Sequence, residues 1–260
     1  MFQTILFELK QGIARITLNR PDKLNSFNER MHQEVRQALD EIQVYGARVL
    51  LITGAGRAFC AGQDLGDRQA SADRQIDLGD TIETYYAPLV RTLRALPLPV
   101  LAGVNGVAAG AGVSLALACD LVVAAKSASF IQSFAKLGLV PDTGGTFFLP
   151  RLVGTARALG LALLGERLSA EQAAAWGLIW RCVDDESFGG SIEELVNILA
   201  AAPTKGLACT KAAINRSADH SLNEQLDLER DYMRELGRSN DYREGVTAFL
   251  EKRPAKFTGT

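Results

Sequence analysis

The chain has 260 residues, of which 47% are hydrophobic and 22% are charged, and its formal net charge is −2. This length and composition predict a globular protein with a substantial core, and the near balance of charge argues against nucleic acid as a partner. No apolar run reaches the ~20 residues of a membrane-spanning helix, and no basic-then-apolar leader opens the chain. The cysteines lack the paired spacing of a zinc site, and two histidines are too few for a histidine-based metal centre. We therefore expect a cytoplasmic protein with free thiols that binds no metal, nucleic acid or membrane.

Strands and helices are expected to alternate in the first half of the chain. Apolar runs on either side of Gln11-Gly12 predict a hairpin, and Asn28 is a good N-cap for a helix with apolar residues at helical spacing. A second helix should end before Pro97. The expected elements are strands at 4–9, 13–19, 48–53 and 100–104, a helix after Asn28, and a helix over 78–95.

The second half is expected to be mostly helical. Strands are expected at 120–125, 128–131 and 180–183, with an irregular loop over 132–150. The expected helices cover 155–164, 169–176, 190–201, 204–218, 221–237 and 240–251, and from Arg253 we expect a tail that is ordered only when something docks on it. This order of elements predicts α/β layers with crossover units, followed by a helical region.

A glycine-rich turn joins a strand to a helix at 99–120. The apolar strand runs into Asn105-Gly106, small residues with Gly110 and Gly112 follow, and an apolar helical run comes next. The first N–H groups of a helix have no intrahelical acceptor, and the helix dipole adds partial positive charge there. Such a terminus can bind a phosphate, or it can bind the oxyanion that develops on a carbonyl during catalysis. The local pattern leaves both open.

Two other patterns are weaker signals. Residues 54–56 begin like a dinucleotide-binding fingerprint, but Phe59 stands where the third glycine would be. The residues around Ser114 resemble the elbow of a serine hydrolase, but the downstream His220 lies in a polar link between helices, so we favour Ser114 as a small packing residue. We interpret His32 and His220 as ordinary surface or boundary residues.

Asp142 stands among apolar residues in the loop over 132–150. A carboxylate in apolar surroundings has a raised pKa and can move protons near neutral pH. The alternative is a turn aspartate that caps a helix beginning near Gly144. By themselves, these residues favour neither interpretation.

Five segments, in order along nearly the whole chain, carry a resemblance to a known family. Residues 58–65 (AFCAGQDL) and 105–112 (NGVAAGAG) resemble the two signature segments of the crotonase (enoyl-CoA hydratase/isomerase) superfamily. Residues 20–27 resemble the opening motif of the superfamily, and residues 142–146 resemble its Gly-Gly-Thr turn. Residues 168–178 resemble the segment that leads from a helix to the final strand.

The resemblance implies a fold, a substrate class and an assembly. The fold is an α/β, crotonase-like spiral of repeated ββα units in residues 1–200, followed by a helical C-terminal trimerisation region in residues 201–260. The substrate is an acyl-CoA thioester, and because CoA is part of the substrate, no separate cofactor is expected. The chain is expected to form a homotrimer or a dimer of trimers.

The resemblance also assigns the catalytic groups. The backbone N–H groups of Gln63 and Ala111 fall at the family's oxyanion hole, which agrees with a helix N-terminus near Ala111. Asp142 falls where dienoyl-CoA isomerases of the family place an aspartate, whereas Ser114 and Phe134 replace the two glutamates of the hydratases. One carboxylate and an oxyanion hole suit proton transfer. The residues expected to bind the substrate are Lys23, Leu24, Asn25, Ala61, Gly62, Asp64, Leu65, Ala109, Gly110, Ser114 and Phe134.

Three runs, at 134–146, 176–185 and 241–252, resemble those isomerases of the family that act on the ring epoxide of an arylacetyl-CoA. Such enzymes can also move a double bond of an enoyl-CoA from the 3 to the 2 position. The alternatives are an enoyl-CoA hydratase of the β-oxidation type and a non-catalytic acyl-CoA-binding protein. Residues 66–80 are polar, and the sequence leaves open whether they close over the substrate.

Overall fold

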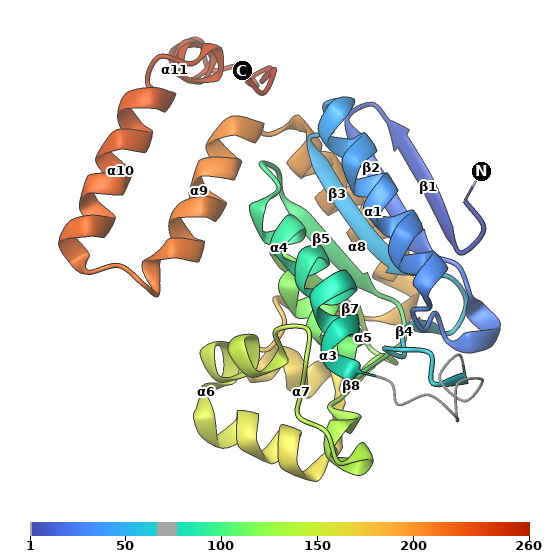
Figure 1. Cartoon of the computed structure of the whole chain (residues 1–260). Coiled ribbons are helices and arrows are strands. Elements are labelled where there is room, and N and C mark those ends of the chain that lie inside the picture. The colour runs from blue at the N-terminus through green and yellow to red at the C-terminus, as the bar shows by residue number, and fades with distance from the viewer. Residues whose placement is uncertain (1, 67–76) are drawn as a thin grey trace.

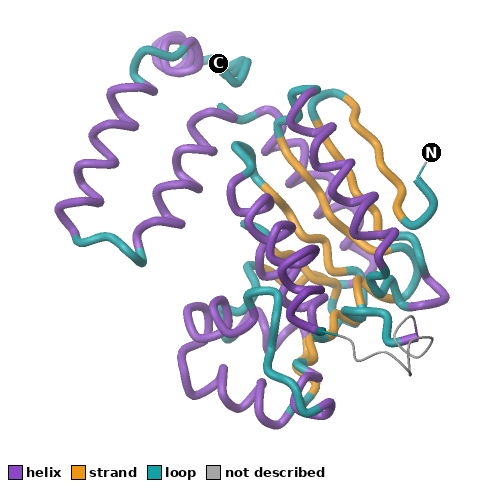
Figure 2. The backbone as a smooth tube through the Cα atoms, in the orientation of Figure 1, coloured by secondary structure: helices purple, strands orange, loops and turns teal. Residues whose placement is uncertain are grey.

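The computed structural model describes residues 2–66 and 77–260, which form two β-sheets with helices around them (Figure 1; Figure 2). In the larger sheet, β1 (Ile5–Lys10) is antiparallel to β2 (Ile13–Leu18), and all other neighbouring strands are parallel. The pairing of β1 with β2 confirms the predicted hairpin. The strands, in spatial order, are β1 (Ile5–Lys10), β2 (Ile13–Leu18), β3 (Val49–Gly54), β5 (Val100–Val104), β7 (Leu121–Ala125) and β10 (Arg181–Val183).

A second sheet is built from short strands. They are, in spatial order, β4 (Ala58–Cys60), β6 (Val107–Ala109), β8 (Ser129–Ile131) and β9 (Arg167–Ser169). Along the chain, each of these strands except β9 comes directly after a strand of the larger sheet: β4 follows β3, β6 follows β5, and β8 follows β7. The chain thus passes repeatedly from one sheet to the other and then into helical structure, which confirms the predicted spiral of ββα units.

Helices cover both faces of the larger sheet. Along β3, Leu50 and Ile52 point into the main core, whereas Val49 and Leu51 point into a smaller core on the opposite face with Val196 of α8. α5 is buried along its whole length, so the glycine-rich turn lies inside the molecule. The helices that contribute to the main core include α1 (Glu29–Val44), α4 (Ala87–Ala95) and α5 (Ala111–Ala118), and α8 (Asp185–Ala201) covers the other face.

The helix expected over 78–95 is divided. A short α3 (Leu78–Thr81) leads into a π-helical turn (Ile82–Tyr86), which continues into α4. A π turn inserts an extra residue into a helix, and such turns are frequent at functional sites. Apolar spacing predicts the helix but not the π turn, because one inserted residue changes the period only locally.

α6 (Gly145–Leu164) begins inside the segment that was expected to be a loop. Gly154 interrupts the helix with φ 77° and ψ 161°. By length and composition alone, this helix could cross a membrane. The interruption leaves two helices that are each shorter than the ~20 residues a span requires. α7 (Ala170–Ala175) follows it.

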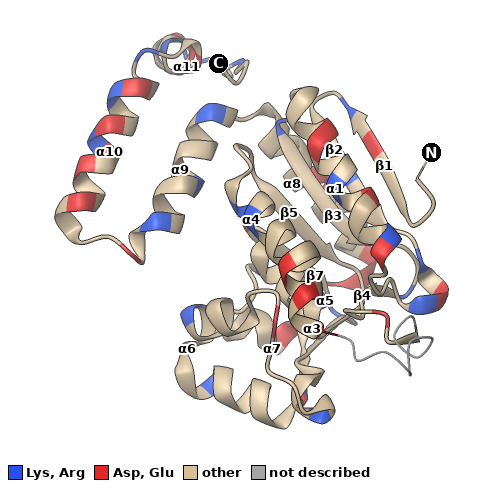
Figure 3. Cartoon of the chain, in the orientation of Figure 1, with Lys and Arg blue, Asp and Glu red and all other residues tan. Residues whose placement is uncertain are grey.

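The last three helices extend away from the sheets (Figure 1). Lys211 of α9 anchors them, because its ammonium donates to Asp120 Oδ2 and to the Leu93 carbonyl, both at 2.8 Å. Figure 3 shows acidic and basic residues intermingled along α10. The helices are α9 (Thr204–Ser217), α10 (Leu222–Leu236) and α11 (Asn240–Glu251). The division of the chain into 1–200 and 201–260 stays a prediction.

The expectation of a tail without order of its own is wrong. The buried carboxylate of Asp241 accepts hydrogen bonds from the N–H groups of Thr258 and Gly259 at 2.7 and 2.9 Å. Arg48 donates to the carbonyls of Phe257 and Ala202 at 3.1 and 2.7 Å. The tail therefore folds back on the start of α11, where side chains of the protein itself satisfy its backbone groups.

Candidate active site

The loop after β4 and the start of α5 are in backbone contact at Gly62. Gly62 has φ +88°, and a Cβ atom there would lie 2.9 Å from the Ala109 carbonyl oxygen and 3.1 Å from the Ala111 nitrogen. The parallel pairing of β4 with β6 brings these segments side by side. A side chain at this position would push them apart, so glycine is what allows Gln63 and Ala111 to be neighbours.

A short bridge to Phe27 fixes the backbone of Gln63. The Phe27 N–H donates to the Gly62 carbonyl at 2.7 Å, and the Asp64 N–H donates to the Phe27 carbonyl at 2.8 Å. This pairing uses the groups on either side of Gln63 and turns its own N–H the other way. Within residues 2–66 and 77–260, the Gln63 N–H has no hydrogen-bond acceptor.

A second such N–H group belongs to Ala111, the first residue of α5. The preceding Gly110 is the N-cap, with φ 53°, and no side chain caps this helix. The Val113 N–H donates to the Gly110 carbonyl at 3.0 Å, whereas the Ala111 N–H has no acceptor among the residues that the structure describes. The helix dipole adds positive potential at this end. Two unpaired N–H groups, of Gln63 and Ala111, thus lie on segments in contact, an arrangement able to stabilise an oxyanion.

Ser114 of α5 faces the loop that carries Asp142. A Cβ atom on Gly145 would lie 2.9 Å from Ser114 Oγ and 3.1 Å from Pro141 Cβ. In the loop, the Thr143 hydroxyl donates to Asp142 Oδ1 at 2.9 Å, and Asp142 is half-buried. The loop of Asp142 therefore packs against the helix whose first residue is Ala111.

The alternative interpretation of Asp142, as the cap of a helix, is wrong. Gly144 is the N-cap of α6, and no side chain caps that helix. The Gly145 N–H donates to the backbone carbonyl of Asp142 at 2.8 Å. Thr143 and Gly144 both have positive φ, 54° and 85°, so the chain turns sharply between Asp142 and the helix. The raised pKa expected for Asp142 stays a prediction.

Ser114 and Phe134, which are expected at the positions of the two hydratase glutamates, do not ionise near neutral pH. Phe134 lies in a 3₁₀ turn (Ser133–Leu137), and its ring is 3.7 Å from the position of a Cβ atom on Gly110. The Ser114 hydroxyl is buried and has no hydrogen-bond partner among the described residues. The Phe134 ring therefore lies beside Gly110, the residue that precedes α5.

Two residues expected to bind the substrate, Asn25 and Asp64, have partners within the protein. The buried Asn25 amide donates to the carbonyls of Ala55 and Ala58 at 2.9 and 2.8 Å. Asp64 forms an ion pair with Arg20 at 2.8 Å. Burial acts to raise the pKa of Asp64, but hydrogen bonds and the Arg20 charge outweigh it, so the pKa lies below its ordinary value. These side chains hold the loops at 20–27 and 61–65 in place.

The other expected binding residues differ in exposure. Lys23 and Leu65 are exposed, and Ala109 at the end of β6 is half-buried. The Leu24 carbonyl accepts a hydrogen bond from the Ala61 N–H at 2.9 Å, so the two predicted binding segments adjoin each other. Contact of these residues with a substrate stays a prediction.

Two further expectations concern a lid and a metal. The lid considered at 66–80 falls mainly on residues 67–76, which lie outside the described residues. In the described ranges, 2–66 and 77–260, no group of at least three His, Cys, Asp or Glu side chains is placed to hold a metal ion. The cysteines are free, as predicted.

Behind Gln63 lies a group of rings that the sequence did not connect with the site. The Tyr86 hydroxyl donates to Gln63 Oε1 at 3.0 Å. The interpretation of His32 as a surface or boundary residue is wrong, because it is buried against the rings of Tyr85 and Tyr86. Burial lowers the pKa of His32 to about 4, so the ring is neutral near pH 7. Its helical spacing from the buried Leu39 was the signal that could have revealed this position.

The chain is similar to known proteins over nearly its full length. The family model described as enoyl-CoA hydratase/isomerase matches residues 8–260. The chain is 54% identical over 261 residues to the 1,2-epoxyphenylacetyl-CoA isomerase of Escherichia coli K12, with 100% of each chain covered. It is 48% identical to a "Probable enoyl-CoA hydratase" of Rhodobacter capsulatus, with 99% of each covered. An enoyl-CoA hydratase subunit I structure from Geobacillus kaustophilus gives a TM-score of 0.91 at 34% identity, with 100% of this chain and 99% of that chain covered.

The fold defines a protein of the crotonase class. The chain belongs to the enoyl-CoA hydratase/isomerase family, whose model it matches over nearly its full length. The structural match at a TM-score of 0.91 also confirms the predicted fold class.

Proposed function

We propose that this chain, an isomerase of CoA thioesters, converts the ring 1,2-epoxide of phenylacetyl-CoA into the isomeric oxepin-CoA. A relative that is 54% identical over the full length is named for this substrate, which supports the choice. The observation that carries the proposal is the pair of unpaired N–H groups, of Gln63 and Ala111, on segments next to the loop of Asp142. The same groups would serve to move a double bond of an enoyl-CoA from the 3 to the 2 position.

The proposed reaction begins at the CH₂ group next to the thioester. Asp142 removes a proton from this carbon, the electrons of the C–H bond form a C=C bond, and the carbonyl oxygen becomes an enolate. The N–H groups of Gln63 and Ala111 donate to that oxygen. Such donors act most strongly where water is excluded, and loss of one lowers kcat by about 10²–10³-fold.

The proton is then returned at another carbon. The C–C bond shared by the epoxide and the six-membered ring breaks, and its electrons join those of the two ring C=C bonds to form the three C=C bonds of a seven-membered ring that includes the oxygen. The enolate oxygen then re-forms its C=O bond, the enolate C=C electrons shift toward the ring, and a ring carbon takes the proton from protonated Asp142. No atom is gained or lost. A single carboxylate is enough, because the group that takes the proton also returns it. Phe134, beside the first turn of α5, would offer the substrate ring an apolar contact.

Hydration of an enoyl-CoA is the second candidate, because a "Probable enoyl-CoA hydratase" is 48% identical to the chain. Adding water requires groups that orient and deprotonate a water molecule. Ser114 and Phe134 stand at the two positions expected to do this, and neither is a base near neutral pH. We therefore favour isomerisation over hydration, and over a binding protein without turnover.

Binding and assembly complete the proposal. The nucleotide part of CoA would lie along residues 23–25 and 61–65, where exposed Lys23 can meet its phosphates, and no other cofactor is required. A homotrimer or dimer of trimers would cover the apolar side chains of α11, where Phe249 and Leu250 are 83% and 74% exposed. We place the protein in the cytoplasm. Light scattering that gives a monomer would remove the assembly from the proposal.

Mass spectrometry of the products tests the function. Wild-type protein and Asp142→Asn are incubated with a 3-enoyl-CoA and with the ring epoxide. We expect a new isomer of unchanged mass from the wild type and none from the variant. A product heavier by one water would establish a hydratase, and full turnover by folded Asp142→Asn would refute the role of Asp142.

Isotope exchange tests the enolate itself. A saturated arylacetyl-CoA is incubated with each protein in D₂O. Wild-type protein should exchange the hydrogens next to the thioester for deuterium, and Asp142→Asn should not. Absence of exchange by the wild type would refute the enolate route.

A further inference from the structure

The side chain of Gln63 is held as firmly as its backbone. The Tyr86 hydroxyl donates to Gln63 Oε1 at 3.0 Å, while Phe27 pairs with the peptide groups on both sides of Gln63. We propose that Tyr86 is a positioning residue that orients the Gln63 N–H toward the substrate oxygen. This inference rests on the proposed function, in which that N–H is a donor to the enolate.

Tyr86 is itself fixed by its surroundings. Its side chain is 1% exposed, and its ring packs edge-on against His32 with the centroids 4.5 Å apart. Phe27 contacts both rings, at 4.7 Å from His32 and 6.1 Å from Tyr86. The residue that pairs with the Gln63 backbone therefore also packs against the ring that holds the Gln63 side chain.

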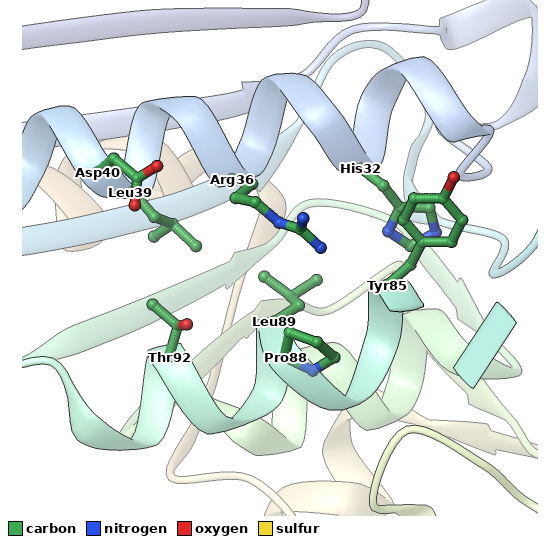
Figure 4. A pocket seen from close by; sticks show the side chains of 8 residues that line it. All are labelled: His32, Arg36, Leu39, Asp40, Tyr85, Pro88, Leu89 and Thr92. Carbon is green, nitrogen blue, oxygen red and sulfur yellow. The ribbon is translucent and has the colours of Figure 1, made fainter. Parts of the chain in front are cut away.

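The π turn presents two consecutive tyrosines to His32. Tyr85 stacks on the imidazole at 4.9 Å with an interplanar angle of 20°, while Tyr86 meets its edge at 89°. Figure 4 shows Tyr85 over His32 at one end of a hollow of about 260 Å³ between α1 and α4. Both tyrosine rings therefore pack against His32, and the Tyr86 hydroxyl donates a hydrogen bond to Gln63.

Orientation matters because an oxyanion hole works only when its donors point at the charge that develops. Catalytic groups must be held within about 0.5 Å of the productive geometry, and hydrogen bonds from neighbouring residues supply that restraint. A backbone N–H in a loop is not held in direction by the regular hydrogen bonds of a helix or sheet. Anchoring the Gln63 carboxamide restricts rotation of the whole residue, and this restricts the direction of its N–H.

Tyr86→Phe removes the hydroxyl and keeps the ring. We expect kcat for a 3-enoyl-CoA to fall about tenfold, since small misplacements of a catalytic group cost up to about 10²-fold, with KM changed less than twofold. Gln63→Ala keeps the N–H but removes the anchored carboxamide and should show a similar loss. If the hydroxyl acts through Gln63, the double variant should lose no more than the worse single variant.

Tyr85→Phe is the matched control. It removes the neighbouring hydroxyl and leaves the stacked ring, so its kcat should equal that of the wild type. The melting temperature of every variant is measured beside its kcat, because a variant that is merely less stable would lose folded protein without a change in kcat per folded molecule.

A spectroscopic measurement separates this inference from the proposed function. A conjugated arylenoyl-CoA absorbs at longer wavelength when hydrogen bonds polarise its thioester carbonyl, and the shift needs no turnover. We expect wild-type protein and Tyr85→Phe to give the full red shift at saturation, and Tyr86→Phe and Gln63→Ala to give a smaller one. A full shift and full kcat in Tyr86→Phe would refute the positioning role, as would independent losses that multiply in the double variant. A red shift without isomerase activity in the wild type would refute the proposed function alone.

Discussion

Replacing Gly62 by alanine tests how the backbones of Gln63 and Ala111 are brought together. The added carbon would lie 2.9 Å from the Ala109 carbonyl oxygen and 3.1 Å from the Ala111 nitrogen. Both contacts are with backbone atoms, which cannot rotate away as a side chain can. Ordinary contacts are about 3.5 Å or longer, so the two segments must separate by roughly half an ångström.

Two effects follow from this separation. Alanine at φ +88° is strained, which costs on the order of 1–3 kcal/mol of unfolding free energy. The N–H groups of Gln63 and Ala111 also move apart. Because a misplacement of 1 Å costs about 10²-fold in rate, half of that distance should lower kcat about tenfold, or ~1.4 kcal/mol of transition-state stabilisation.

The matched control is Gly46→Ala. Gly46 also has positive φ, +71°, but no atom of the described residues lies within 4 Å of the Cβ position, so this variant carries backbone strain without the contact. Urea unfolding should show a loss of stability in both variants, and steady-state kinetics with a 3-enoyl-CoA should show a loss of kcat in Gly62→Ala alone. Wild-type kcat in folded Gly62→Ala, or an equal loss in Gly46→Ala, would refute the reasoning.

Three further variants probe the base, the C-terminal anchor and the buried imidazole. Asp142→Asn should lower kcat at least about 10²-fold, because an amide cannot accept the proton. Calorimetry should show an unchanged affinity for a saturated acyl-CoA. Turnover near the wild-type rate would contradict the role of Asp142 as the base. Lys211→Met leaves Asp120 without the ammonium 2.8 Å away, and urea unfolding should show a loss of about 3 kcal/mol of unfolding free energy. Lys205→Met removes an exposed ion pair and should lower the unfolding free energy by under about 1 kcal/mol. Equal losses in the two variants would refute the anchoring role of Lys211. The pKa of His32 is about 4 in the folded protein and 6.5 in its ordinary state. Between these pH values the unfolded chain binds a proton that the folded chain does not. The free energy of unfolding should therefore fall by up to ~3 kcal/mol as the pH drops from 6.5 to 4. In His32→Phe that part of the pH dependence should vanish, and an unchanged slope in urea titrations would contradict the assignment.

The fold could be predicted from the sequence because its signals are local and repeated. Apolar runs bounded by turn residues marked β1, β2, β3 and β5, and the order of the glycine-rich segments matched one family over nearly the whole chain. The loop expected over 132–150 was too long, because α6 begins at Gly145 and accommodates Pro150 inside the helix. Only the alternative interpretation of Asp142 placed a helix start near Gly144. The docked tail was missed because Asp241 and Arg48, which hold it, are far from it in sequence.

The sequence by itself determined the family and the fold class, and it predicted Gln63, Ala111 and Asp142 as site residues. Only the tertiary structure decided which groups surround them. It showed that Gly62 touches Ala111, that Tyr86 bonds to Gln63, that His32 is buried, and that Asp142 does not cap α6. The physical reason is that spacing along a chain encodes strands, turns and helix termini, whereas a hydrogen bond between residues of different elements exists only after packing has brought their side chains together.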